Sequence, residues 1–186
     1  PCIVEENAGS TAGRIFFDTS YSGFEEAMLA FYEEYLAAAE DPALLKDSRF
    51  AVSRERAAGL YLLADRLRDG ARVRASKGQV TGPFTMLTGI KDTAGRAGYF
   101  NEMIRDMVIK GIAMKAAWQT RLLAGSNGQP VLLFIDEPAL AGLGSSAFIS
   151  VTGEEITAMI NEAAAAIHDA GGLAGIHVCA NTDWSI

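Results

Sequence analysis

Pro130–Ala139 reads PVLLFIDEPA, an unbroken apolar run that ends in two carboxylates and a proline. Such runs are typical of strands that are buried on both faces of a parallel sheet. A second, largely apolar run, Leu173–Val178, follows two glycines. We therefore expect both segments to be strands of one parallel sheet, with polar side chains gathered at their carboxyl ends.

Helical patterns alternate with these strands. Thr152–Ala170 starts with Thr and Glu at the spacing of a capping box, and a glycine follows it. Gly98–Ala124 carries apolar residues at helical spacing. Ahead of it, Ala71–Ser76 alternates apolar residues with arginines and predicts a further strand. The order strand, helix, strand, helix, strand predicts an α/β fold of βαβ units with right-handed crossovers.

Residues 1–70 give weaker signals. A short strand is expected at Pro1–Val4, and a strand or an extended loop at Arg14–Phe17. A helix is expected over Ser22–Ala39, with Ser22 as its N-cap and Glu25 at the capping-box position. A further helix is expected over Ser53–Arg68, where apolar residues recur on one face.

The composition excludes several classes of protein. The 186 residues are 49% hydrophobic and carry 16 Lys and Arg against 23 Asp and Glu, a net charge of −7. Phosphate backbones and anionic lipids repel an acidic chain, so we expect no nucleic-acid partner. No apolar run reaches the roughly 20 residues of a membrane span. Two cysteines are too few for a disulfide framework and favour a reducing, cytoplasmic location.

The length bears on the architecture. A complete (β/α)₈ barrel usually needs about 250 residues, more than this chain has. The first residue is Pro rather than Met, and the last residues, Asp183–Ile186, carry no turn or cap signal. We therefore expect a single domain over 1–186 that is a piece of a longer protein.

Asp136 and Glu137 end the central apolar run. Two carboxylates at such a place are costly to bury unless something binds them. Successive strand residues face opposite sides, so only one of the two is expected to face a central pocket. That carboxylate would bind a substrate ammonium or a proton; the alternatives are a loop N-cap and a structural ion pair.

His177 and Cys179 follow the last predicted strand at a spacing of two, which places both side chains on one face. Imidazole and thiolate are good zinc ligands, with bonds of about 2.0 and 2.3 Å. A tetrahedral zinc needs two more ligands, and the sequence offers no second pair of this kind. The alternative is a histidine and a cysteine buried in the core.

Thr81 and Gly82 precede Pro83 in a pattern typical of a helix start. Such a helix would point its N-terminus at the site and favour an anion or a developing negative charge. The alternative is a plain tight turn.

Three motifs lie in order at the predicted strand ends: KGQVTGP (77–83), FIDEPA (134–139) and IHVC (176–179). Together they resemble the catalytic domain of cobalamin-independent methionine synthase. The wider superfamily joins that enzyme to uroporphyrinogen decarboxylase and to the zinc-dependent corrinoid:thiol methyltransferases. The resemblance is good over residues 71–186 and weak over residues 1–70.

The resemblance implies a partial (β/α)₈ TIM barrel of the uroporphyrinogen decarboxylase and methionine synthase type. His177 and Cys179 match the first two zinc ligands of the family, and a later Cys and commonly a Glu would follow beyond this sequence. Asp136 matches the carboxylate that holds the amino group of homocysteine. We place Glu137 and Thr81 in the substrate site with it.

The function that follows from the resemblance is zinc-dependent methyl transfer to a thiol such as homocysteine, with zinc activating the thiol. The methyl donor would be a methyl-folate or a methyl-corrinoid protein. Two alternatives stay open: a decarboxylase of the uroporphyrinogen type that uses no metal, and a barrel relative without catalytic activity. Glu5 or Glu6 is a further candidate for a substrate carboxylate.

Overall fold

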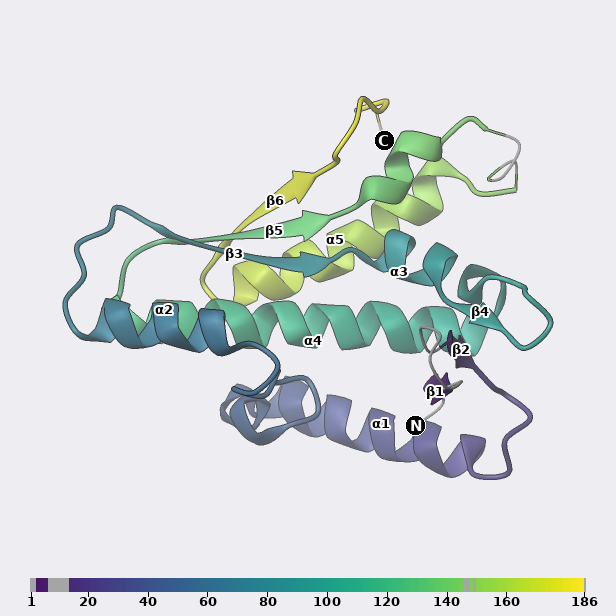
Figure 1. Ribbon diagram of the computed structural model, residues 1–186, viewed down its shortest axis with the longest axis horizontal. Coiled ribbons are helices and arrows are strands. Elements are labelled where there is room, and N and C mark those ends of the chain that lie inside the picture. Colours follow the sequence, from purple (N-terminus) through teal and green to yellow (C-terminus); the bar gives the residue numbers. More distant parts are fainter. Residues whose placement is uncertain (1–2, 7–13, 146–147, 149, 186) are drawn as a thin grey trace.

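The computed structural model describes residues 3–6, 14–145, 148 and 150–185. Helices and strands alternate along most of this part of the chain (Figure 1). The elements are β1 (Ile3–Glu6), β2 (Arg14–Phe17), α1 (Phe24–Glu40), η1 (Pro42–Asp47), α2 (Ala58–Arg68), β3 (Ser76–Thr81), α3 (Pro83–Gly89), β4 (Lys91–Asp92), η2 (Gly98–Phe100), α4 (Glu102–Asn127), β5 (Val131–Asp136), η3 (Pro138–Gly142), α5 (Gly153–Asp169) and β6 (Leu173–His177).

The strands β3, β5 and β6 form a parallel sheet in that order. Residues of β3 alternate between buried and exposed, as do most residues of β5. The buried residues face α4 and α5, which pack on the sheet, and the other face is open. Each new strand adds on the same side of the previous one, so the strand order never reverses within this sheet.

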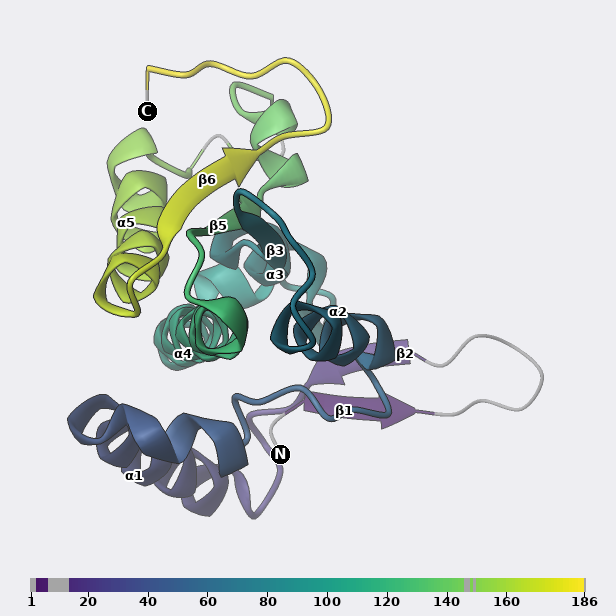
Figure 2. The same cartoon turned by 90° about the vertical axis from the view of Figure 1, so that its left-hand side faces the viewer.

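The helix α4 lies between the sheet and α1 in both views (Figures 1 and 2). It is 26 residues long and has buried residues on most of its faces, as expected of a helix that is packed on several sides. Asn101 caps it by accepting a hydrogen bond from the N–H of Ile104. At its other end Gly128, with φ of 68°, takes the left-handed conformation typical of a helix C-terminus.

A second small sheet joins β1, β2 and β4. The strands β1 and β2 are antiparallel, whereas β2 and β4 are parallel. Phe17 of β2 is buried and belongs to the main hydrophobic core. This sheet therefore extends the core beyond the three parallel strands.

One strand lies in a different place from the one expected. The predicted strand Ala71–Ser76 is wrong, because β3 covers Ser76–Thr81 and most of the residues before it are exposed. The residues of β3 that face the helices are Ser76, Gly78 and Val80. Only one of these is a large apolar residue, so the strand carries no hydrophobic alternation that the sequence reveals.

Three helix starts also differ from expectation. The helix α1 begins at Phe24 with Gly23 as its N-cap and no side-chain cap, so Ser22 does not cap it. The helix expected from Ser53 begins instead at Ala58, as α2. Before it the chain makes a separate turn, in which the N–H groups of Arg56 and Ala57 donate to the carbonyl of Ser53. A short 3₁₀ turn, η2, likewise precedes α4. By contrast, the capping box at the start of α5 is confirmed.

The predicted α/β class with parallel strands is confirmed, but neither sheet closes on itself within the described residues. A closed barrel is therefore not seen in this part of the chain. Of the helices described, none combines the length and the apolar character needed to cross a membrane.

Candidate functional site

Three polar residues form a row across the parallel sheet at the carboxyl ends of its strands. Thr81 of β3 pairs with Asp136 of β5, and Asp136 pairs with His177 of β6. Side chains of paired residues in parallel strands point to the same face. Thr81 and His177 are exposed and Asp136 is partly exposed, so the row lies on the open face of the sheet.

His177 connects this row to Cys179. Its Nδ1 lies 3.2 Å from Oδ1 of Asp136, and its Nε2 lies 3.9 Å from Sγ of Cys179. The imidazole is about half exposed, with a side-chain exposure of 52%, and the thiol is exposed. The two side chains converge, as the spacing of two residues predicts, and neither is buried in the core.

The contact with Asp136 determines how the imidazole can act. An Nδ1–H group that donates to a carboxylate leaves the lone pair of Nε2 free. That lone pair faces Cys179. Carboxylate, imidazole and thiol thus stand in a line in which the carboxylate orients the ring, an arrangement common behind metal-bound histidines.

Glu137 lies on the other side of the strand end from Asp136 and is fully buried. Its Oε1 accepts a hydrogen bond from Phe84 N at 2.9 Å, and its Oε2 accepts from Thr85 N at 2.8 Å and Thr85 Oγ1 at 2.6 Å. Both N–H groups belong to the first turn of α3, where no helical acceptor is available. Glu137 therefore caps α3, a helix that begins more than 50 positions earlier in the sequence, and this contact was not predicted.

Gly82 makes this position of Glu137 possible. A Cβ at Gly82 would lie 2.1 Å from Cδ of Glu137, closer than any side chain tolerates. Burial raises the pKa of Glu137, because the charged form loses its hydration, while the hydrogen bonds from Thr85 and Phe84 act against that shift. The anion expected at the N-terminus of α3 is thus the carboxylate of the chain itself.

Backbone hydrogen bonds join the three strand ends beyond the last paired residues. Gly82 N donates to the carbonyl of Asp136, and Glu137 N donates to the carbonyl of His177, both at 2.8 Å. Together with the Glu137 carboxylate, these bonds hold the ends of β3, β5 and β6 in fixed relation. These bonds therefore fix the backbone that carries the row of side chains on the open face.

The structure thus brings together four of the predicted site residues, Thr81, Asp136, His177 and Cys179, and places Glu137 behind them. Sequence reasoning missed Thr85, whose hydroxyl binds Glu137 and also accepts a hydrogen bond from Ala139 N at 3.1 Å. No local pattern in the sequence indicates this contact, because Thr85 and Glu137 lie 52 positions apart. The side chains of Glu5 and Glu6 lie outside the described residues.

Within the described residues, no group of three or more His, Cys, Asp and Glu side chains is placed to hold a metal ion. His177 and Cys179 are a pair of donors, so a metal bound here needs ligands from elsewhere. Zinc bonds of about 2.0 and 2.3 Å at tetrahedral angles would set nitrogen and sulfur about 3.5 Å apart. The observed 3.9 Å between Nε2 and Sγ is close to that value, so the donor pair fits zinc.

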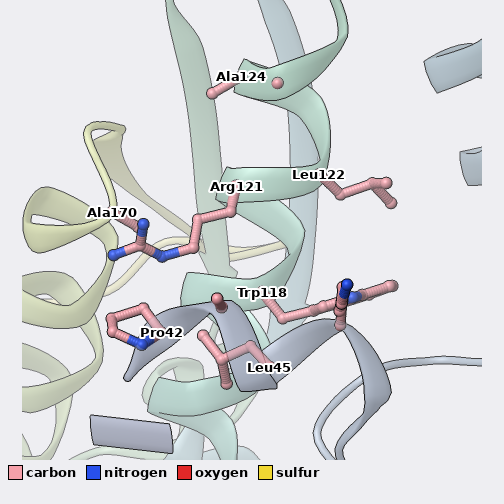
Figure 3. A pocket seen from close by; sticks show the side chains of 10 residues that line it. Pro42, Leu45, Trp118, Arg121, Leu122, Ala124 and Ala170 are labelled. Carbon is pink, nitrogen blue, oxygen red and sulfur yellow. The ribbon is translucent and has the colours of Figure 1, made fainter. Parts of the chain in front are cut away.

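A hollow of about 540 Å³ lies elsewhere, between η1 and α4 (Figure 3). Pro42, Leu45 and Trp118 line it, and Arg121 reaches across from α4 toward Ala170, at the C-terminal end of α5. A cation at this position complements the partial negative charge of the helix end. The hollow contains none of the predicted site residues.

Comparison of the chain with protein-family models, with curated proteins and with solved structures found no match.

Proposed function

We propose that the chain forms part of a (β/α)₈ barrel of the methionine synthase type. The parallel sheet supports this, because its strands add in one direction and its long helices, α4 and α5, pack on one face. Doubly wound sheets reverse their strand order and carry helices on both faces, whereas barrels do neither. In the barrel the open face of the sheet becomes the interior.

In a barrel, β3 must also pair with a strand on the side away from β5. The side-chain amide of Gln119 now binds both backbone groups of Gln79, with its Oε1 2.8 Å from the N–H and its Nε2 3.1 Å from the carbonyl. These groups lie on the edge of β3 that faces away from β5. A strand that joins β3 on this side must replace Gln119 there.

The proposed activity is zinc-dependent transfer of a methyl group to a thiol such as homocysteine, from a methyl-folate or a methyl-corrinoid protein. The observation that carries it is the line from Asp136 through His177 to Cys179 on the open face at the carboxyl ends of the strands. Active sites of barrels lie at this end. His177 and Cys179 would hold the zinc together with the later Cys and, commonly, the Glu that the resemblance implies, and the substrate sulfur would bind the same zinc.

Zinc, when bound, favours the thiolate form of the substrate, which is the nucleophile in methyl transfer. The chain's own residues supply the geometry. Oδ1 of Asp136 lies 3.2 Å from Nδ1 of His177; with the proton on Nδ1, Asp136 would orient the ring and leave Nε2 as the ligand. The other carboxylate oxygen of Asp136 would hold the amino group of homocysteine, as the resemblance implies. Thr81 lies beside Asp136 and can bind a polar group of the substrate. Glu137 acts as a positioning residue, because it fixes the strand ends without reaching the open face.

Cobalt titration of the purified chain tests the proposal, because Co²⁺ substitutes for zinc and shows near-ultraviolet absorption when thiolates bind it. We expect His177→Ala and Cys179→Ser to abolish this absorption. Homocysteine should strengthen Co²⁺ binding by adding a ligand, whereas homoserine should not. Asp136→Asn should weaken binding about 10- to 100-fold.

The sequence offers matched controls, since it contains one other histidine and one other cysteine, His168 and Cys2. His168→Ala and Cys2→Ser should bind cobalt like the unchanged chain. Equal binding by all four single variants would refute the assignment of His177 and Cys179. An unchanged spectrum on addition of homocysteine would refute the thiol as the substrate.

A further inference from the structure

A cavity of about 250 Å³ lies between α1 and α4. Met107, Gly111 and Lys115 line it from one stripe of α4, since residues four apart lie on the same helix face. Phe31 of α1 and Phe50, which follows η1, face this stripe and are both buried. Gly111 helps to leave the space, because a Cβ there would already touch the Phe31 ring at 3.6 Å.

The charges around this cavity are unbalanced. The backbone N–H of Arg49 donates to Oε1 of Glu34 at 2.6 Å, and its guanidinium forms an ion pair with the same carboxylate. Lys115, by contrast, reaches only the carbonyl of Phe50, with Nζ at 3.5 Å. Of the residues that the structure describes, none offers Lys115 a carboxylate within ion-pair distance, and burial lowers its pKa. A partly buried ammonium group among apolar side chains therefore stands without a counter-ion.

We propose that this cavity binds a small molecule with an apolar body and a single carboxylate, which pairs with the ammonium group of Lys115. A carboxylate offsets the cost of burying the charge. The aromatic rings of Phe31 and Phe50 and the adaptable side chains of Met86 and Met107 suit a hydrocarbon body. The cavity volume of about 250 Å³ leaves room for a short hydrocarbon chain that carries one carboxylate.

This site is separate from the row of Thr81, Asp136 and His177. The row lies on the open face of the sheet, whereas residues of α1 and α4 line the cavity. Figure 2 shows α1 on the side of α4 that is turned away from the sheet. The proposal therefore does not depend on methyl transfer, and either can fail without the other.

Hexanoate is a probe of the right size, and the methyl groups of methionine report where it binds. The chain has six methionines; Met86 and Met107 line the cavity, whereas Met159 of α5 does not. In a titration of the ¹³C-methyl-labelled chain followed by NMR, hexanoate should shift the signals of Met86 and Met107 in a saturable way. The signal of Met159 should stay in place.

Charge and space are tested by separate variants. Lys115→Gln should weaken hexanoate binding about tenfold, and Gly111→Leu, which fills the cavity, should abolish it. Lys46→Gln is the matched control, because Lys46 is exposed and lines the hollow beside η1 instead. Hexan-1-ol should bind more weakly than hexanoate, and Lys115→Gln should leave its affinity unchanged.

Three outcomes would overturn the proposal. The first is the absence of saturable shifts at Met86 and Met107 in the unchanged chain. The second is equal affinity for hexanoate in Lys115→Gln and Lys46→Gln. The third is binding of hexan-1-ol as tight as that of hexanoate, which would show that Lys115 contributes nothing.

Discussion

Replacing Gly82 by alanine should destabilise the protein strongly although its backbone is compatible with alanine. The φ and ψ angles of Gly82 are −73° and 156°, an extended conformation open to any residue. The added Cβ, however, would lie 2.1 Å from Cδ and 2.3 Å from Oε1 of Glu137. The carboxylate must therefore leave its place between Gly82 and the start of α3.

The cost follows from the hydrogen bonds that the carboxylate makes. Three donors, Phe84 N, Thr85 N and Thr85 Oγ1, would lose a charged acceptor, and each such bond contributes about 1.5–3 kcal/mol. Release of the buried charge into water offsets part of this loss. We expect Gly82→Ala to lower the free energy of unfolding by about 3–5 kcal/mol, within a total of about 5–15 kcal/mol for a typical domain.

Urea denaturation followed by circular dichroism measures this cost, and Gly89→Ala is the matched control. Gly89 lies in the same helix, and a Cβ there meets nothing within 4 Å, so its replacement should leave stability unchanged or raise it slightly. The decisive measurement is a double-mutant cycle with Glu137→Ala. Once Glu137 is truncated, the methyl group added at position 82 has no carboxylate to displace, so Gly82→Ala should then cost almost nothing.

The reasoning is wrong if Gly82→Ala stays within about 0.5 kcal/mol of the unchanged chain, which is the spread expected of a harmless substitution. It is equally wrong if the costs of Gly82→Ala and Glu137→Ala add. Additivity would mean that the two side chains do not compete for the same space.

Three further predictions concern stability. Because burial holds the pKa of Glu137 above its ordinary value of 4.5, its contribution to stability is complete below that value and is lost as the pH rises through the raised pKa. The free energy of unfolding of the unchanged chain should therefore fall relative to that of Glu137→Gln as the pH rises above 4.5; a constant difference in urea titrations at several pH values would contradict this. Thr152→Ala removes the hydroxyl that accepts from Glu155 N at 3.2 Å at the start of α5 and should cost about 1 kcal/mol, whereas Thr152→Ser should cost little. Ser76→Ala should raise the thermal midpoint, because the Ser76 hydroxyl is buried without a partner among the described residues and such a group costs about 1–3 kcal/mol; a lower midpoint would reveal a missed hydrogen bond.

The sequence predicts those elements whose stabilising contacts are local. The strands β5 and β6 show as apolar runs, and α5 shows through the capping box of Thr152 and Glu155. The strand β3 does not show, because two of its three core-facing residues are Ser76 and Gly78. A serine and a glycine carry no hydrophobic signal. The alternation of apolar residues with arginines in Ala71–Ser76 was therefore the stronger pattern, and it placed the predicted strand too early in the sequence.

The candidate site likewise combines contacts that the sequence predicts, because they are local, with contacts that depend on residues far apart in the sequence. The spacing of His177 and Cys179 is local and predicts that they converge, although β6 ends at His177 and Cys179 lies in the bend that follows it. The contact between Asp136 and His177 depends on the register of β5 and β6, which the sequence does not determine. The capping of α3 by Glu137 joins residues 52 and 53 positions apart, and no local pattern indicates which carboxylate a helix start will meet.

The backbone bonds at the strand ends have a consequence for the order in which the native protein opens. The amides of Gly82 and Glu137 are tied to Asp136 and His177 and sit beside a buried, satisfied carboxylate. A fluctuation confined to a loop cannot free them, because β3 must detach from β5 to release the amide of Gly82, and β6 must detach from β5 to release that of Glu137. In native-state hydrogen exchange the two protons should therefore report separate openings, the amide of Gly82 that of β3 from β5 and the amide of Glu137 that of the edge strand β6.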